Sequence, residues 1–219
     1  MRNKIILSCV FVLYITKIQA QGYLSGSLDL QNNFFILDEN ILTDPFPPQY
    51  ENQRISTEAW LNLNYRYKNF SAGLRYDAFY NSGLRDPNFA YTGQGIGFWY
   101  VNAQIKDLEI TAGSFYDQFG SGIAFRAYEA RGQQLDYAIQ GIHLKYNLNN
   151  KYYFKAFGGR QKNNPLDADE LLDTYESVIY GANAETRYEI GSAAEILPGA
   201  SVVTRVLDNN TVNILRTNI

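Results

Sequence analysis

The sequence predicts an all-β protein, specifically an antiparallel up-and-down transmembrane β-barrel of which about eight or nine strands are present. Three observations favour this fold class. Apolar and polar side chains alternate with a period of two, tight turns alternate with long polar connections, and aromatic residues make up 15% of a chain whose mean hydropathy is only -0.30. After the first 20 residues no apolar run is long enough for a membrane-spanning helix.

Residues 1–20 are expected to be a signal peptide that is cleaved on export. Arg2 and Lys4 precede an apolar stretch from Ile5 to Ile15, and Lys17 and a small residue suited to cleavage, Ala20, follow. The stretch is shorter than the roughly 20 apolar residues that a membrane anchor needs. The mature protein is therefore expected in the cell outer membrane.

Cleavage of this leader would also change the chemistry of the chain. It removes Cys9, so no cysteine remains. It also removes three positive charges, so the formal net charge changes from -3 to -6. The mature chain would then have no disulfide, no thiolate nucleophile and no lipid-bearing cysteine. Nucleic acid is not expected as a partner, because its phosphates bind basic surfaces.

The clearest element is a hairpin between Ser56 and Tyr80. Apolar side chains occupy one parity of each strand, whereas charged and amide side chains occupy the other, and Lys68 and Asn69 form a two-residue turn. The register is self-consistent, because apolar residues then face apolar residues across the hairpin. The expected pairs are Tyr67 with Phe70, Leu63 with Leu74, Leu61 with Tyr76, and Ala59 with Ala78.

Further strands repeat this pattern along the chain. A first strand is expected at Tyr23–Gln31, an eighth at Ser177–Tyr188, and one more at Ala200–Leu207. Two other hairpins lie between them, one around a tight turn at Lys106 and Asp107 and one around a five-residue loop. The expected pairs are Ile105 with Leu108, Ala103 with Ile110, and Val101 with Ala112, and, across the loop Asn147–Lys151, Tyr146 with Tyr152, Leu144 with Phe154, and Ile142 with Ala156.

Long polar connections alternate strictly with the tight turns, as in outer-membrane barrels with short periplasmic turns and long external loops. The strand that carries the apolar face from Thr57 to Tyr67, tilted roughly 40°, covers about 25 Å of bilayer. Residues 21–189 are therefore expected to form the barrel strands. Residues 190–219 are an uncertain tail, a truncated or divergent continuation of a larger barrel. The long connections are expected at Ile36–Arg54, Asn81–Gly95, Gln118–Gln134 and Gln161–Thr174.

A soluble β-sandwich also alternates along each strand and is the competing fold. Its short and long connections need not alternate, and tyrosines would not usually mark both ends of its buried face. In this sequence Tyr65 and Tyr67 mark the tight-turn end of the apolar face, and Tyr76 and Tyr80 mark the other. The barrel is therefore favoured.

Two segments of the sequence carry a resemblance to a known family: Gly22 to Leu28, and Phe119 to Gly122 continuing through Arg131, Gly132, Asp136, Ile139 and Gly141. Over Gly22 to about Tyr188 the chain resembles the amino-terminal part of an uncharacterised family of Bacteroidota outer-membrane, porin-like β-barrel proteins. The resemblance implies location and fold, and it implies no assigned activity.

The polar parity of the strands supplies the candidate lumen residues. Mixed charges on the wall of an open barrel would select solutes by charge and size, which predicts a passive, porin-like channel for small solutes. In a small closed barrel the same charges would pair and fill the interior. The lumen-lining candidates are Glu58, Arg66, Arg75, Asp77, Glu109, Lys145, Lys155, Glu185 and Arg187.

The connection from Gln118 to Gln134 is long and mixed enough to fold inward as a constriction or to bind a partner, although a plain exposed loop is the simpler expectation. Its constriction candidates are Arg126, Glu129 and Arg131. The alternative function is a non-conducting barrel whose external loops bind a surface, secretion or adhesion partner. Lipid and lipopolysaccharide are the other expected partners.

Catalysis is not expected. An enzyme would have to use His143, the only histidine, but its neighbours place it inward beside Lys155, with no serine in a nucleophile-elbow context nearby. One histidine and no mature cysteine do not make a zinc site. No cofactor or metal is expected.

Overall fold

A computed structural model of the protein describes residues 22–36, 54–83, 91–133, 135–163, 171–191 and 194–207, together with 209 and 212. The predicted signal peptide and most of the predicted loop Ile36–Arg54 lie outside the described residues. Within the described part of the chain, no helix is long and apolar enough to cross a membrane.

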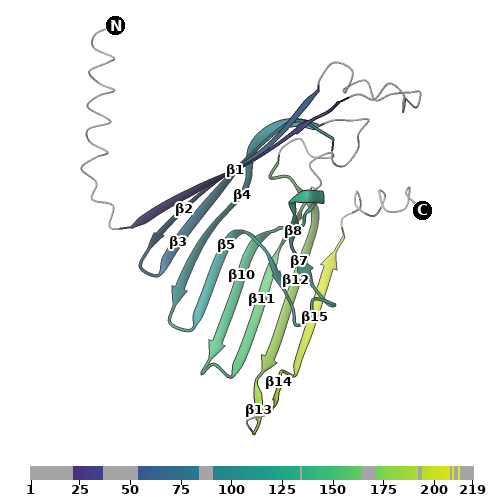
Figure 1. Ribbon diagram of the computed structural model, residues 1–219. Helices are drawn as coiled ribbons and strands as arrows, with labels where there is room; N and C mark the ends of the chain where they lie inside the picture. The colour runs from purple at the N-terminus through teal and green to yellow at the C-terminus, as the bar shows by residue number, and fades with distance from the viewer. Residues whose placement is uncertain are drawn as a thin grey trace.

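The described chain is all-β, and its main feature is one nine-stranded antiparallel sheet (Figure 1). The strands lie in the order β1-β2-β3-β4-β5-β10-β11-β12-β15, so each strand pairs with the next one along the main path of the chain. Their bounds are β1 Tyr23–Phe34, β2 Ile55–Tyr67, β3 Phe70–Ser82, β4 Tyr91–Ile105, β5 Leu108–Phe115, β10 Ile139–Leu148, β11 Tyr152–Lys162, β12 Thr174–Thr186 and β15 Gly199–Val206. The sheet is open as described, with β1 and β15 at its two edges.

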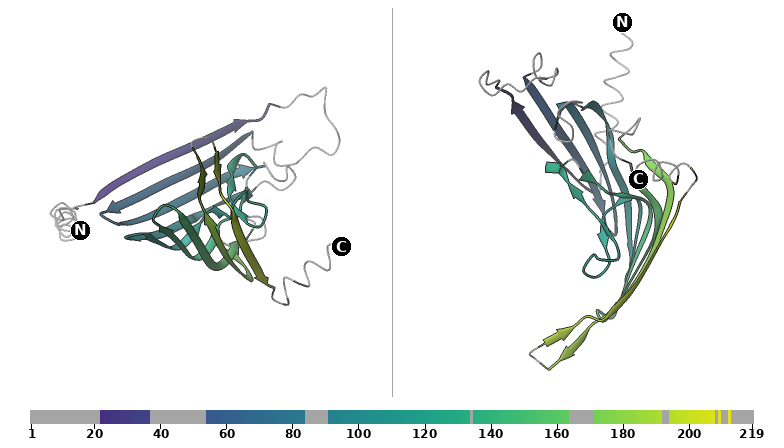
Figure 2. Two further views of the ribbon diagram at one scale, coloured as in Figure 1. Left: turned by 90° about the horizontal axis from the view of Figure 1, so that it is seen from below. Right: turned by 90° about the vertical axis from the view of Figure 1, so that its right-hand side faces the viewer.

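The sheet is strongly curved, and the β5–β10 connection lies on its concave side (Figure 2). This connection, residues 116–138, is called the inward loop below. It contains two short strand pairs and a 3-10 turn: β6 Asp117–Gln118 with β7 Arg126–Ala127, and β8 Glu129–Ala130 with β9 Leu135–Asp136 around η1 Arg131–Gln133. A further hairpin, β13 Tyr188–Ile190 with β14 Ala194–Ile196, extends beyond the tight-turn end of the sheet (Figure 1).

The first two predicted hairpins are confirmed pair by pair. Tyr67 lies opposite Phe70 and Leu63 opposite Leu74, and Ile105 lies opposite Leu108 in the second hairpin. Both tight turns begin at a lysine with positive φ, 49° at Lys68 and 53° at Lys106. The alternation of tight turns with long connections is also confirmed through β12.

The third predicted hairpin is confirmed as a hairpin, but its predicted register is wrong by two residues. Leu148 pairs with Tyr152, and Tyr146 faces Phe154 rather than Tyr152. Asn149 and Asn150 both adopt positive φ, which asparagine tolerates better than most residues, and Lys151 N–H donates to Leu148 O at 3.1 Å. The chain therefore turns in three residues instead of five, and because the shift is even, every side chain keeps its predicted face.

The ninth strand is confirmed, because β15 pairs with β12 along its length. Residues 199–206 of the predicted tail therefore belong to the sheet. The predicted eighth strand begins earlier than expected, at Thr174, and ends at Thr186.

Burial separates the two faces of the sheet in the opposite sense from a soluble protein. On β3, Leu74, Tyr76 and Tyr80 are exposed, whereas Arg75 and Asp77 are buried. The apolar parity thus lies on the convex face and the polar parity beneath the inward loop. The exposed apolar side chains of the convex face include Leu28, Leu61, Leu63, Leu74, Tyr76, Trp99, Val101, Ile142, Leu144, Phe154, Tyr180 and Val202.

The buried apolar core lies between the inward loop and the concave face. Its members are buried side chains from both layers, namely Phe115, Phe119, Phe125, Ala127, Ile139 and Phe157. Ile179 and Val203 are partly buried and pack against this core. Phe125 stacks on Phe157 with ring centroids 4.3 Å apart. An aromatic cluster thus fixes the loop to the sheet.

Candidate functional site

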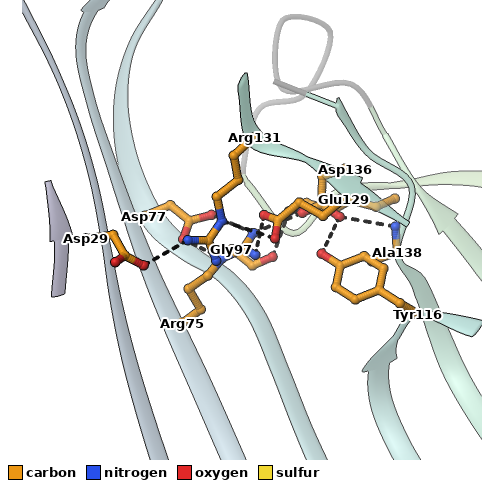
Figure 3. A network of polar contacts seen from close by, with 10 residues as sticks. Asp29, Arg75, Asp77, Gly97, Tyr116, Glu129, Arg131, Asp136 and Ala138 are labelled. Carbon is orange, nitrogen blue, oxygen red and sulfur yellow. Dashed lines mark hydrogen bonds and ion pairs between the residues drawn. The ribbon is translucent and has the colours of Figure 1, made fainter. Parts of the chain in front are cut away.

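The candidate site is an ionic network that joins β3 to the inward loop (Figure 3). Arg75 and Asp77 lie two residues apart on β3, so both side chains point to the concave face. The guanidinium of Arg75 binds Asp77 in a bidentate manner, with Nε–Oδ1 2.7 Å and Nη2–Oδ2 2.9 Å. The same guanidinium donates to Glu129 at 2.6 Å and Asp136 at 3.0 Å, so two carboxylates of the loop share one arginine of the sheet.

A bulge in β4 makes room for this cluster. The register of β3 against β4 shifts so that Arg75 faces Phe98 and Tyr76 faces Ile96. Gly97 therefore has no residue opposite it on β3. A Cβ at Gly97 would lie 1.8 Å from Asp77 Oδ2, so only glycine permits the carboxylate to occupy this position. Gly97 O also accepts a hydrogen bond of 2.7 Å from Lys162 Nζ.

Asp136 is the second centre of the network. Its carboxylate accepts from Lys162 Nζ at 2.7 Å, from the Tyr116 hydroxyl at 2.8 Å and from the Ala138 N–H at 3.2 Å. Burial works to raise the pKa of Asp136, but the charges of Lys162 and Arg75 and the hydrogen bonds from Lys162 and Tyr116 together outweigh burial and leave that pKa below its ordinary value. Burial raises the pKa of the Tyr116 hydroxyl, and the charges of Asp136 and Glu129 add to the rise, so Tyr116 remains a donor.

Arg131 extends the network to the first strand of the sheet. It lies 3.2 Å from Glu129 and 3.0 Å from Asp29 on β1, and its guanidinium lies 5.2 Å from the centroid of the Trp60 ring. Arg131 thus links the η1 turn directly to β1 and β2, and Glu129 links it to β3. The space left beside the network is about 40 Å³, which is room for ordered water rather than for an organic ligand.

A second polar contact fixes the start of the inward loop. The Asp117 carboxylate accepts from Lys155 Nζ at 2.7 Å and lies 2.8 Å from Nε2 of the buried His143, whose ring stacks on Phe115 at 4.6 Å. Burial works to raise the pKa of Asp117, but the contacts with His143 and Lys155 outweigh it and lower the pKa to about 2. Asp117 therefore stays ionised under ordinary conditions.

Four of the predicted lumen and constriction residues meet in the main network, namely Arg75, Asp77, Glu129 and Arg131. Lys155 contributes to the second contact instead. Glu58 is fully buried and accepts a hydrogen bond from Ser82. The sequence thus identified residues that the fold brings together, although it did not identify their partners.

The other candidates lie apart from the network. Glu185 accepts from the Gly120 N–H at 3.0 Å, and Lys145 lies 3.8 Å from Glu109 on the partly exposed wall. Arg66 is exposed near the first tight turn. Arg126 is exposed and lies over the Tyr128 ring, and Arg187 pairs with Glu195 of β14, outside the nine-stranded sheet.

The simpler expectation for the inward loop, a plain exposed segment, is wrong. Phe119 is 2% exposed and Phe125 6% exposed, because Gly120 and Gly122 adopt φ values of 51° and 87° and turn the chain back onto itself. Phe119 N–H donates to Phe125 O at 3.0 Å across this turn. A sequence signal for this packing exists. Trp60, Phe115 and Phe157 are large apolar residues at positions that otherwise carry polar side chains, and such residues on the concave face need apolar neighbours.

The fold and the network define an all-β protein whose curved sheet holds an inward-folded loop on its concave face. A family model described as a family of unknown function, DUF6029, matches residues 1–218. The chain therefore belongs to this family. A search of curated proteins found no match to the chain.

Proposed function

We propose that the protein is an outer-membrane β-barrel that acts as a porin-like passive channel for small solutes, with lipid and lipopolysaccharide as its surroundings. One observation carries the proposal: the convex face exposes Leu, Ile, Phe and Tyr across the sheet, while ionic side chains are buried on the concave face. Water favours the reverse arrangement, and hydrocarbon around a polar interior favours this one. The inward loop would then narrow the solute path.

The proposal places a requirement on the edges of the sheet. Backbone N–H and C=O groups that face hydrocarbon must be paired, and β1 and β15 each have a strand on one side only in the described chain. We therefore expect both edges to be paired in the inserted protein, either with further strands or across an interface between copies.

The first experiment tests insertion. Full-length protein without its leader is refolded from urea in the presence of phospholipid vesicles, and the vesicles are floated on a density gradient. Floating protein that resists alkaline extraction supports insertion. A freely soluble monomer that never enters detergent or vesicles would refute the barrel in any form.

The second candidate function is a non-conducting barrel whose long loops bind a surface, secretion or adhesion partner. The packing of the inward loop favours it, because the loop is held by the aromatic cluster and by both polar contacts, with little space left at the main network. Neither function includes a catalytic step, a cofactor or a metal.

Conductance separates the two functions. The inserted protein is studied in a planar bilayer over a range of voltages, with an Arg75→Ala variant that releases part of the loop as a second sample. Discrete steps from the wild-type protein support the channel. Silence from the wild type with steps from Arg75→Ala supports a barrel that the loop closes.

A further inference from the structure

A second, larger space lies on the concave face, away from the ionic network. It has a volume of about 520 Å³ and lies between the tip of the inward loop and strands β12 and β15. This volume falls in the range of small-molecule sites, in contrast to the roughly 40 Å³ beside Arg75. Its lining combines polar and apolar side chains, chiefly Phe119, Ser121, Asn183, Glu185, Leu197 and Ser201.

The polar lining presents hydrogen-bond acceptors that are already oriented. Glu185 Oε1 is held by the Gly120 N–H at 3.0 Å, and Asn183 Nδ2 donates to Ser201 Oγ at 2.9 Å. Asn183 is only 5% exposed, and its Oδ1 atom has no hydrogen-bond partner within the described part of the chain. That oxygen has less than 1 Å² of accessible surface, so a molecule in the pocket meets the Glu185 carboxylate rather than the Asn183 amide oxygen.

The charge of the pocket selects the kind of donor. Among the described residues that line it, Glu185 is the one charged side chain. Lys155 contacts Gln118 O next to the loop tip, but its charge is paired with Asp117 at 2.7 Å. An ammonium group can donate to the carboxylate, and charge-assisted hydrogen bonds of this kind are the strong ones.

We propose that this pocket binds a small organic cation with a primary ammonium group and a short apolar body. The ammonium contacts Glu185, and the apolar body lies against Phe119 and Leu197. The inference rests on the proposed function in that the pocket lies on the solute path of the channel and makes that path selective for such cations.

The test measures binding to the full chain in detergent micelles by ligand-observed NMR. The probe is 4-amino-1-butanol, and 1,4-butanediol is its uncharged counterpart of similar length. We expect the amine to bind about tenfold more tightly than the diol, because its ammonium makes a charge-assisted hydrogen bond with Glu185 that the diol cannot make. Equal binding of the two probes would overturn the cation as the ligand class.

One variant and one matched control locate the site. Glu185→Gln keeps the shape of the side chain and should weaken amine binding about tenfold. Glu109→Gln removes a carboxylate from the wall outside the pocket and should leave binding unchanged. If Glu109→Gln weakens binding as much as Glu185→Gln does, the effect belongs to general charge and the site is refuted.

The outcome is separable from that of the channel proposal. Protein that conducts in a bilayer but binds neither probe leaves the channel intact and removes this site. Protein that binds the amine through Glu185 without conducting keeps the site and removes the channel.

Discussion

The two faces of one strand show how differently this sheet treats its side chains. On β3, Arg75 makes contacts with three carboxylates on the concave face, whereas the adjacent Leu74 and Tyr76 on the convex face remain exposed. In a soluble protein the leucine would be buried and the arginine solvated. The stabilising ionic contacts of this fold are concentrated under the inward loop, whereas the convex face leaves its apolar side chains exposed.

The largest effect is expected at Arg75. Replacement Arg75→Ala leaves Asp77, Glu129 and Asp136 close together without their shared cation, and the loss of one partner from a buried ionic cluster costs about 4 kcal/mol. The free energy of unfolding, measured by urea titration of the refolded protein in micelles, should fall by that amount, and the loop should become sensitive to protease. Arg75→Lys keeps the charge but not the bidentate geometry. Its free energy of unfolding should therefore lie between those of the wild type and Arg75→Ala. A loss below 1 kcal/mol for Arg75→Ala would contradict the network as an anchor.

A neighbouring pair on β2 sharpens the comparison of the two faces. Leu63 lies on the convex face and Asn64 on the opposite one, and both are exposed. In a bilayer Leu63→Arg should destabilise the protein by about 2 kcal/mol, because arginine on the lipid face is costly, whereas Asn64→Arg faces water and should have little effect. The measurement is unfolding in phospholipid vesicles. Equal effects of the two variants would show that the convex face does not meet lipid.

The pH dependence of the second contact gives a smaller effect. Because the pKa of Asp117 is lowered to about 2 in the folded protein, the stability it contributes is complete above its unfolded pKa of roughly 4 and is lost as the pH falls towards 2. The stability difference between wild type and Asp117→Asn should therefore shrink as the pH falls from 5 to 2. A constant difference over that range would show that the Asp117 charge does not hold the loop.

The smallest effect is expected on the exposed part of the concave wall. Lys145 lies 3.8 Å from Glu109, and both side chains are more than a third accessible, at 40% and 35%. Lys145→Ala should change the free energy of unfolding by less than 1 kcal/mol, because solvent screens such pairs. A loss as large as that of Arg75→Ala would mean that burial by the loop is not what distinguishes the two pairs.

Local pattern predicted much of the fold. The period of two gave the faces of the strands, and apolar pairing gave the register of the β2–β3 and β4–β5 hairpins. The β10–β11 turn was misplaced because an even shift of register preserves the faces, so the alternation does not distinguish the two alternatives. The positive φ values of Asn149 and Asn150 decided between them.

The candidate site was predicted in part, since Glu129 and Arg131 of the loop were named as constriction residues but their partners were not. Arg75 and Asp77 could be placed inward from parity, but Asp136, Lys162 and Tyr116 come from segments far apart in the sequence, and no local pattern relates them. The inward loop was expected to be exposed, although Phe119 and Phe125 bury their rings. Loop packing depends on the shape of the surface that receives it, and that surface exists only after the sheet has formed.

By itself the sequence determined an alternating antiparallel sheet with an apolar face, a polar face, and a fixed order of tight turns and long connections. These features are local, because each side chain takes its face from its own strand and each tight turn from its own residues. Only the tertiary structure decided that the longest described connection folds onto the concave face, that Gly97 forms a bulge beside Asp77, and that Arg75 is shared by two carboxylates of the loop. The reason is that buried charges are stable only where several chain segments supply partners at hydrogen-bond distance, which is a property of their arrangement in space.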